Sequence, residues 1–153
     1  MEFMKLAIEE AKKGVECGDG GPFGAVLVKD GKVIGKGHNM VLVNKDPTAH
    51  AEVTAIRNTC KNLDTFDLSG CQLYTSCYPC PMCMGAALWS RVDAIYYGAT
   101  SQDAAAIGFG DHEFHAFLQN PKSDEKRKLE QFKVGNYLEP FQIWAKKEDK
   151  SQY

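Results

Sequence analysis

Two short stretches of the chain carry residue types that bind metals and move protons. They are Thr48-Ala49-His50-Ala51-Glu52 and Pro79-Cys80-Pro81-Met82-Cys83. Cys80 and Cys83 are three residues apart, so both thiols lie on one face if they begin a helix. The positive end of that helix favours the thiolate, which is the form of cysteine that binds zinc. His50 adds an imidazole nitrogen, and two sulfurs with one nitrogen form a ligand set that suits zinc.

The number of ligands distinguishes a catalytic zinc from a structural one. A structural zinc is enclosed by four protein ligands, whereas a catalytic zinc keeps one position for water. His50, Cys80 and Cys83 make three, so we expect a water in the fourth position with its pKa lowered toward ~7. Glu52 follows His50 by two residues, and such positions do not share a helix face. We therefore expect Glu52 to carry the water's proton and not to bind the metal.

Three other interpretations of these residues are open. A structural zinc knuckle needs a fourth ligand, for which Cys77 is the candidate because it lies three residues before Cys80. A redox-active CxxC pair has no use for the His-x-Glu stretch. A zinc-binding interaction module without catalysis has no use for a carboxylate at Glu52. The pairing of H-x-E with a later P-C-x-x-C is the pattern typical of zinc-dependent deaminases.

Length, composition and charge favour one soluble domain that acts on a small molecule. The 153 residues are 44% hydrophobic and carry a net charge of -2. This length suits a single domain over residues 1–153. The near-neutral charge argues against a large nucleic-acid partner. No apolar run reaches the ~18–20 residues of a membrane span, and the amphipathic N-terminus is no signal peptide, so we expect a cytoplasmic protein.

Hydrophobic periodicity and turn residues predict an α/β fold. Helices alternate with short apolar strands, and Asp30-Gly31 joins the first two strands as a hairpin. The result is a mixed five-stranded sheet with helices on both faces, a three-layer α/β/α sandwich. The expected strands are 23–28, 32–37, 71–76, 92–98 and 133–138. The expected helices are 2–17, 49–61 (capped by Thr48), 80–90, a solvated helix at 123–131 and a last helix at 139–149, with an irregular loop at 100–112.

At these motifs the sequence resembles the cytidine deaminase-like superfamily of zinc enzymes. The resemblance is clearest at residues 20–26, 46–57 and 74–83, and it implies an α/β/α sandwich with one zinc ion per subunit. Residues 103–105 and 108–111, the segment 140–144 and a chain that ends on Tyr153 resemble the guanine deaminases within it. That implies hydrolysis of guanine to xanthine and ammonia. The motifs are shared with tRNA adenosine deaminases, and deamination of guanosine or cytosine also stays open.

The same resemblance implies roles for residues outside the zinc motifs. Asn39 would hydrogen-bond the base, which Ala51 would also contact. Phe23 and Phe109 would form walls of the pocket. Asp111 would assist Glu52 in moving protons at the exocyclic amine.

The resemblance also implies a homodimer that exchanges its C-terminal segments. The segment of about 137–153 would close the site of the partner subunit, and Tyr153 would reach the substrate there. Two positions depart from the pattern of the relatives. Tyr78 stands where they often have glutamate, and Gly110 stands beside Asp111 where an acidic residue is expected.

Overall fold

The computed structural model describes residues 2–153. It divides into two compact units, Met1–His112 and Glu113–Tyr153, which are considered separately below. No helix among the described residues is long and apolar enough to cross a membrane.

The first unit is built on a mixed sheet of four strands. Its strands are β1 (Gly24–Lys29), β2 (Lys32–His38), β3 (Cys71–Cys77) and β4 (Ala94–Ala99), in the order β2-β1-β3-β4. β1 is antiparallel to both β2 and β3, and β3 is parallel to β4. Asp30 and Gly31 both have positive φ, as the predicted tight hairpin requires. The prediction of a fifth strand is wrong for the described residues, because 133–138 forms a turn and not a strand.

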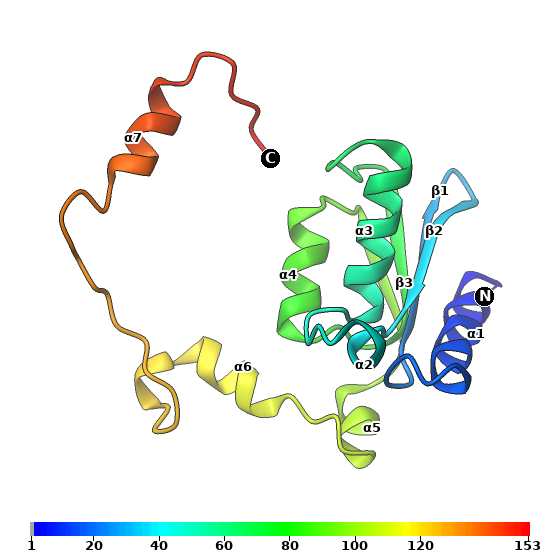
Figure 1. Ribbon diagram of the computed structural model, residues 1–153. Helices are drawn as coiled ribbons and strands as arrows, with labels where there is room; N and C mark the ends of the chain where they lie inside the picture. The colour runs from blue at the N-terminus through cyan, green and yellow to red at the C-terminus, as the bar shows by residue number, and fades with distance from the viewer. Residues whose placement is uncertain (1) are drawn as a thin grey trace. The chain divides into compact units, whose positions relative to one another are not determined.

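Helices cover both faces of the sheet, which confirms the predicted three layers (Figure 1). The alternating side chains of β1 show why. Ala25 and Leu27 pack in one cluster with α3 (Ala51–Leu63) and α4 (Pro81–Trp89). Val26 and Val28 pack on the other side against α1 (Glu2–Glu16). A strand buried on both faces reads as a continuous apolar run, and this is how the sequence presents it.

The strand directions bring several segment ends to one edge of the sheet. Gly24, at the start of β1, pairs with His38 at the end of β2. Ala25 pairs with Thr75 near the end of β3, and Cys77 pairs with Ala99 at the end of β4. The loops that follow or precede these residues therefore meet at this edge.

Two local predictions in this unit need correction. Thr48 does not cap a helix: α3 begins after His50, and the Thr48 hydroxyl donates to Oδ1 of Asp46 instead. The segment 100–112 is not irregular throughout, because α5 (Ser101–Ala106) begins with a capping box between Thr100 and Asp103. The loop after β2 also contains the short helix α2 (Val41–Asn44), which the sequence did not suggest.

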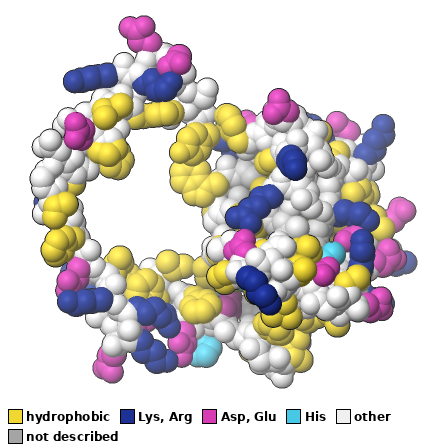
Figure 2. Space-filling view, viewed as in Figure 1, with side chains coloured by type: hydrophobic (Ala, Val, Ile, Leu, Met, Phe, Trp, Pro, Cys, Tyr) yellow, Lys and Arg dark blue, Asp and Glu magenta, His cyan; other side chains and the backbone are white. Residues whose placement is uncertain are grey.

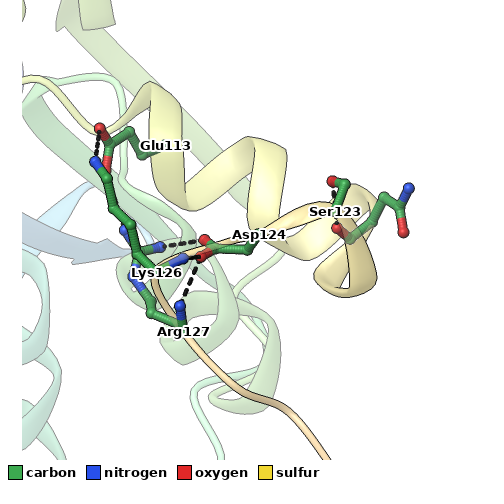
Figure 3. A network of polar contacts seen from close by, with 6 residues as sticks. Glu113, Ser123, Asp124, Lys126 and Arg127 are labelled. Atoms are coloured by element: carbon green, nitrogen blue, oxygen red, sulfur yellow. Dashed lines mark hydrogen bonds and ion pairs between the residues drawn. The ribbon is translucent and has the colours of Figure 1, made fainter.

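The second unit has little regular structure and no buried residue. It contains most of α6 (His112–Gln119), one 3-10 turn at Pro121–Ser123, and α7 (Glu139–Lys146), which agrees with the predicted last helix. The predicted helix at 123–131 is wrong. Asp124 instead accepts hydrogen bonds from the backbone N–H groups of Lys126 and Arg127, and both side chains pair with Glu113 (Figure 3).

Candidate metal centre

The three predicted zinc ligands converge at the edge of the sheet where α3 and α4 begin. His50 is the N-cap of α3 and Cys80 is the N-cap of α4, and both have extended backbone conformations. Pro81 occupies the first turn of α4, where its missing N–H costs nothing. Cys83 lies one turn into the same helix and is fully buried. Neither N-cap side chain bonds to its own helix, so both are available to the site.

The ligand atoms lie close enough to share one metal ion. Nδ1 of His50 is 3.6 Å from Sγ of Cys80 and 3.5 Å from Sγ of Cys83. All three ligand atoms lie within 4.8 Å of one another. Nδ1 is therefore the imidazole nitrogen that faces the two sulfurs. A tetrahedral zinc with bonds of ~2.0–2.3 Å requires spacings of this size between its ligands.

The electrostatics of His50, Cys80 and Cys83 show why a cation fits between them. Hydrogen bonding from Cys83 and from His50 outweighs burial and lowers the pKa of Cys80 to about 4. The neighbouring Cys80 sulfur and burial together raise the pKa of Cys83 above its usual value. One thiolate thus suppresses ionisation of the other. A bound zinc ion removes this conflict, because its charge stabilises both thiolates.

Glu52 lies beside this trio without joining it. The side chain is only 5% exposed, and the Thr75 hydroxyl donates to its Oε1 at 3.1 Å. Burial raises the pKa of Glu52, although hydrogen bonds from Cys83 and Thr75 partly offset that effect. A carboxyl group held in this way is suited to take up and release a proton. Thr75, which orients it from β3, carries no motif, and sequence reasoning missed it.

Cys77 is not a fourth ligand of the cluster. Its thiol donates to the backbone carbonyl of Thr100 at 3.5 Å, and it does not belong to the group of converging ligand atoms. Burial raises the pKa of Cys77, and the nearby carboxylates of Glu52 and Asp111 add to this. The same effect places Asp111 in the neighbourhood of Cys77.

Asn39, at the end of β2, has its side-chain amide held in one orientation. Oδ1 accepts hydrogen bonds from the backbone N–H groups of Gly21 at 3.3 Å and Val41 at 3.1 Å. The residue is 5% exposed, yet no buried side-chain nitrogen or oxygen among the described residues lacks a partner. Because Nδ2 makes no hydrogen bond among these residues, it is the atom that remains accessible as a donor.

The two predicted aromatic walls are in contact. The rings of Phe23 and Phe109 meet edge to face, with centroids 5.1 Å apart and planes at 88°. Gly21 lies against both, since a Cβ there would come within 3.0 Å of Phe109 and 3.1 Å of Phe23. Ala51, in the first turn of α3, is fully buried.

Tyr78 and Tyr153 are two further positions that the sequence singled out. Tyr78 packs edge to face on Tyr97 of β4, with ring centroids 5.1 Å apart. Its side chain thus turns toward the strand and not toward the zinc ligands. Tyr153 is exposed and belongs to the second unit.

A family model matches the part of the sequence that forms this site. Residues 1–99 match the cytidine and deoxycytidylate deaminase zinc-binding region. The chain belongs to this deaminase family. Because the family is zinc-binding and the trio converges, zinc is the cofactor.

Individual relatives differ in how much of this chain they match. The chain is 47% identical over 151 residues to guanine deaminase of Bacillus subtilis (strain 168), covering 99% of this chain and 97% of the relative. The crystal structure of that enzyme matches with a TM-score of 0.95 over the same shares. A tRNA-specific adenosine deaminase of Aquifex aeolicus is 46% identical, but over 69% of each chain. The structure of guanine deaminase from Nitrosomonas europaea matches at a TM-score of 0.67 with 37% identity, covering 71% of this chain and 63% of that one.

The assignment of zinc ligands in this deaminase can be tested with a matched pair of cysteine variants. Cys83→Ser should lose most of the bound zinc, because a neutral hydroxyl replaces a thiolate ligand. Cys77→Ser should keep about one zinc per chain, because the Cys77 thiol donates to the Thr100 carbonyl and lies outside the converging ligand atoms. The zinc content of each dialysed protein gives the answer by atomic emission. Equal loss of zinc from both variants would contradict the three-ligand site.

Proposed function

We propose that this chain is a zinc-dependent guanine deaminase that hydrolyses guanine to xanthine and ammonia. The observation that carries the proposal is the extent of the similarity. Identity to the guanine deaminase of Bacillus subtilis continues over 99% of the chain, whereas the tRNA-specific adenosine deaminase of Aquifex aeolicus matches 69% of it. Identity to the two relatives is similar, at 47% and 46%, so the added coverage favours guanine.

The orientation of Asn39 supports a purine with an acceptor at the matching position. Its Oδ1 is occupied by backbone N–H groups, so Nδ2 can only donate to the substrate. The carbonyl O6 of guanine accepts such a hydrogen bond. Adenine held in the same pose would place its C6 amine against this donor and would present a C2 without an amine, so a site built this way discriminates strongly. Phe23 and Phe109 then supply an aromatic wall for the base.

Glu52 is the group that moves protons in this proposal. His50, Cys80 and Cys83 would hold the zinc ion, which would lower the pKa of a water beside Glu52. Glu52 takes a proton from the attacking water and passes it to a ring nitrogen of guanine, which makes the adjacent C2 more electrophilic. The oxygen of the water forms a bond to C2. Glu52, assisted by Asp111, then moves the remaining proton of that hydroxyl group to the amine, the C2–N bond breaks, ammonia leaves and xanthine remains.

Substrate identity is decided by measuring ammonia release from a panel of compounds. The zinc-loaded protein should release ammonia from guanine, and at least about a hundredfold more slowly from adenine, because adenine in the guanine pose meets the Asn39 donor with its C6 amine and has no amine at C2. Guanosine, cytosine, cytidine and tRNA complete the panel. Activity on tRNA together with silence on every free base would replace guanine deamination with adenosine editing.

The role of Glu52 makes a separate prediction. Glu52→Gln keeps the size and the hydrogen bond from Thr75 but removes the exchangeable proton, so kcat for guanine should fall by about 10²–10⁴-fold. The zinc content should stay unchanged, because Glu52 is not a ligand. Substantial turnover by zinc-loaded Glu52→Gln would rule out this role.

We further propose that the chain acts as a homodimer in which the segment of about 137–153 closes the partner's site, with Tyr153 reaching the base. The composition of the second unit supports this. Phe132, Phe141 and Tyr153 are 85%, 73% and 68% exposed, and the whole unit buries none of its residues. Figure 2 shows hydrophobic side chains along its surface. Exposed apolar surface of this kind marks an interaction site.

Exchange of the segment is tested by complementation between two inactive chains. We expect a chain shortened at residue 136 and full-length Glu52→Gln each to lack activity on guanine. Co-expressed, they should recover it, because the intact Glu52 of one subunit meets the C-terminal segment of the other. Gel filtration of the wild type should show a dimer. A monomer, or failure to complement while both chains fold, would exclude the exchange.

A further inference from the structure

A histidine on the opposite face of the sheet from the zinc ligands joins three segments of the chain. His38 is the last residue of β2 and directly precedes Asn39. Its Nε2 lies 2.8 Å from Oδ2 of Asp19, and its Nδ1 lies 3.3 Å from Oε2 of Glu10 on α1. Lys36 of β2 also reaches Glu10, at 2.7 Å from Oε1. None of these groups belongs to the metal centre.

The two contacts of His38 form a shielded ionic cluster. Burial raises the pKa of Glu10, but hydrogen bonds from Lys36 and His38 outweigh it and hold that pKa below its usual value, so Glu10 is ionised. An ionised carboxylate only accepts hydrogen bonds, so the ring nitrogen of His38 is the donor in the contact with Glu10. Gly14 of α1 makes room for the ring, since a Cβ there would lie 2.8 Å from Cδ2 of His38.

Asp19 connects this cluster to the loop that holds Asn39. The backbone carbonyl of Asp19 accepts hydrogen bonds from the N–H groups of Leu42 at 3.0 Å and Val43 at 3.1 Å, in α2. Gly20 packs directly on the amide of Asn39, where a Cβ would come within 2.1 Å of Oδ1. Two residues after Asp19, the backbone N–H of Gly21 bonds to that same Oδ1. The position of Asp19 thus sets the donors that orient the side chain of Asn39.

We propose that His38 is a positioning residue for the substrate-reading amide of Asn39. It fixes Asp19, and through Asp19 it holds the 19–21 loop against Oδ1, which leaves Nδ2 as the donor offered to the base. This inference rests on the proposed function, because it assigns Asn39 to guanine. Its consequence is that loss of the Asp19 contact weakens substrate binding and leaves the chemical step intact, since His38 touches neither the zinc ligands nor Glu52.

Two conservative substitutions separate the contacts of His38. The amide nitrogen of glutamine reaches the position of Nε2, so His38→Gln keeps a donor to Asp19. The amide nitrogen of asparagine reaches only the position of Nδ1, so His38→Asn keeps a donor to Glu10 and loses Asp19. We expect His38→Asn to raise KM for guanine about tenfold with kcat nearly unchanged, and His38→Gln to restore a KM close to that of the wild type. Zinc content should be the same in all three proteins.

A second substitution keeps the test decisive if His38→Asn folds poorly. Asp19→Ala removes the other half of the contact and should raise KM as His38→Asn does, and the double variant should show no further rise. The inference is overturned by an equal KM for His38→Asn and His38→Gln, by additive effects in the double variant, or by a fall in kcat alone. If the wild type releases no ammonia from guanine, the proposed function fails instead. The same comparison is then made with the base that the wild type does deaminate.

Discussion

Two thiols and an imidazole held within bonding distance of one metal ion are the constraint on which the first unit depends. The sulfurs of Cys80 and Cys83 both face Nδ1 of His50, and one ionised sulfur raises the cost of ionising the other. A cation between them relieves that cost, so metal binding and the folded arrangement stabilise each other. Helices α3 and α4 position these side chains. Their N-cap residues give up the usual capping hydrogen bond and offer their side chains to the metal.

The accuracy of the sequence predictions follows from how local each signal is. The Asp30-Gly31 turn, the doubly buried β1 and Pro81 at the start of α4 depend on neighbouring residues, and all three agree with the structure. The cap at Thr48 is wrong because the metal centre, a nonlocal constraint, places His50 at the start of α3. The capping box of Thr100 and Asp103 was present in the sequence, but the Gly- and Ala-rich stretch around it concealed the helix.

In the second unit, the one prediction that agrees with the structure also rests on a local signal. The amphipathic pattern of α7 is local and predicted that helix, whereas a strand at 133–138 needs a neighbouring strand, and none pairs with it among the described residues. The charged segment before it is no helix, because the carboxylate of Asp124 captures the N–H groups of Lys126 and Arg127 and competes with helical hydrogen bonds. A segment without a core of its own takes its conformation from what it packs against, and a single sequence does not specify that surface.

The roles proposed for the zinc centre and Glu52 are the same for any amine-bearing base, so in this proposal base identity has to come from outside this edge. Guanine and tRNA adenosine deaminases among the relatives have comparable identity to this chain, which agrees with a common catalytic edge. In the proposed function, the backbone around Asn39 supplies this discrimination between bases. Oδ1 of Asn39 accepts from the backbone N–H groups of Gly21, in the loop before β1, and of Val41, in α2, which makes the side chain a donor only. This arrangement requires glycine at position 20, because a Cβ there would collide with Oδ1. In the proposed function, selectivity for a base with an acceptor is therefore built from a backbone conformation. It can be altered without any change to the residues that bind zinc or move protons.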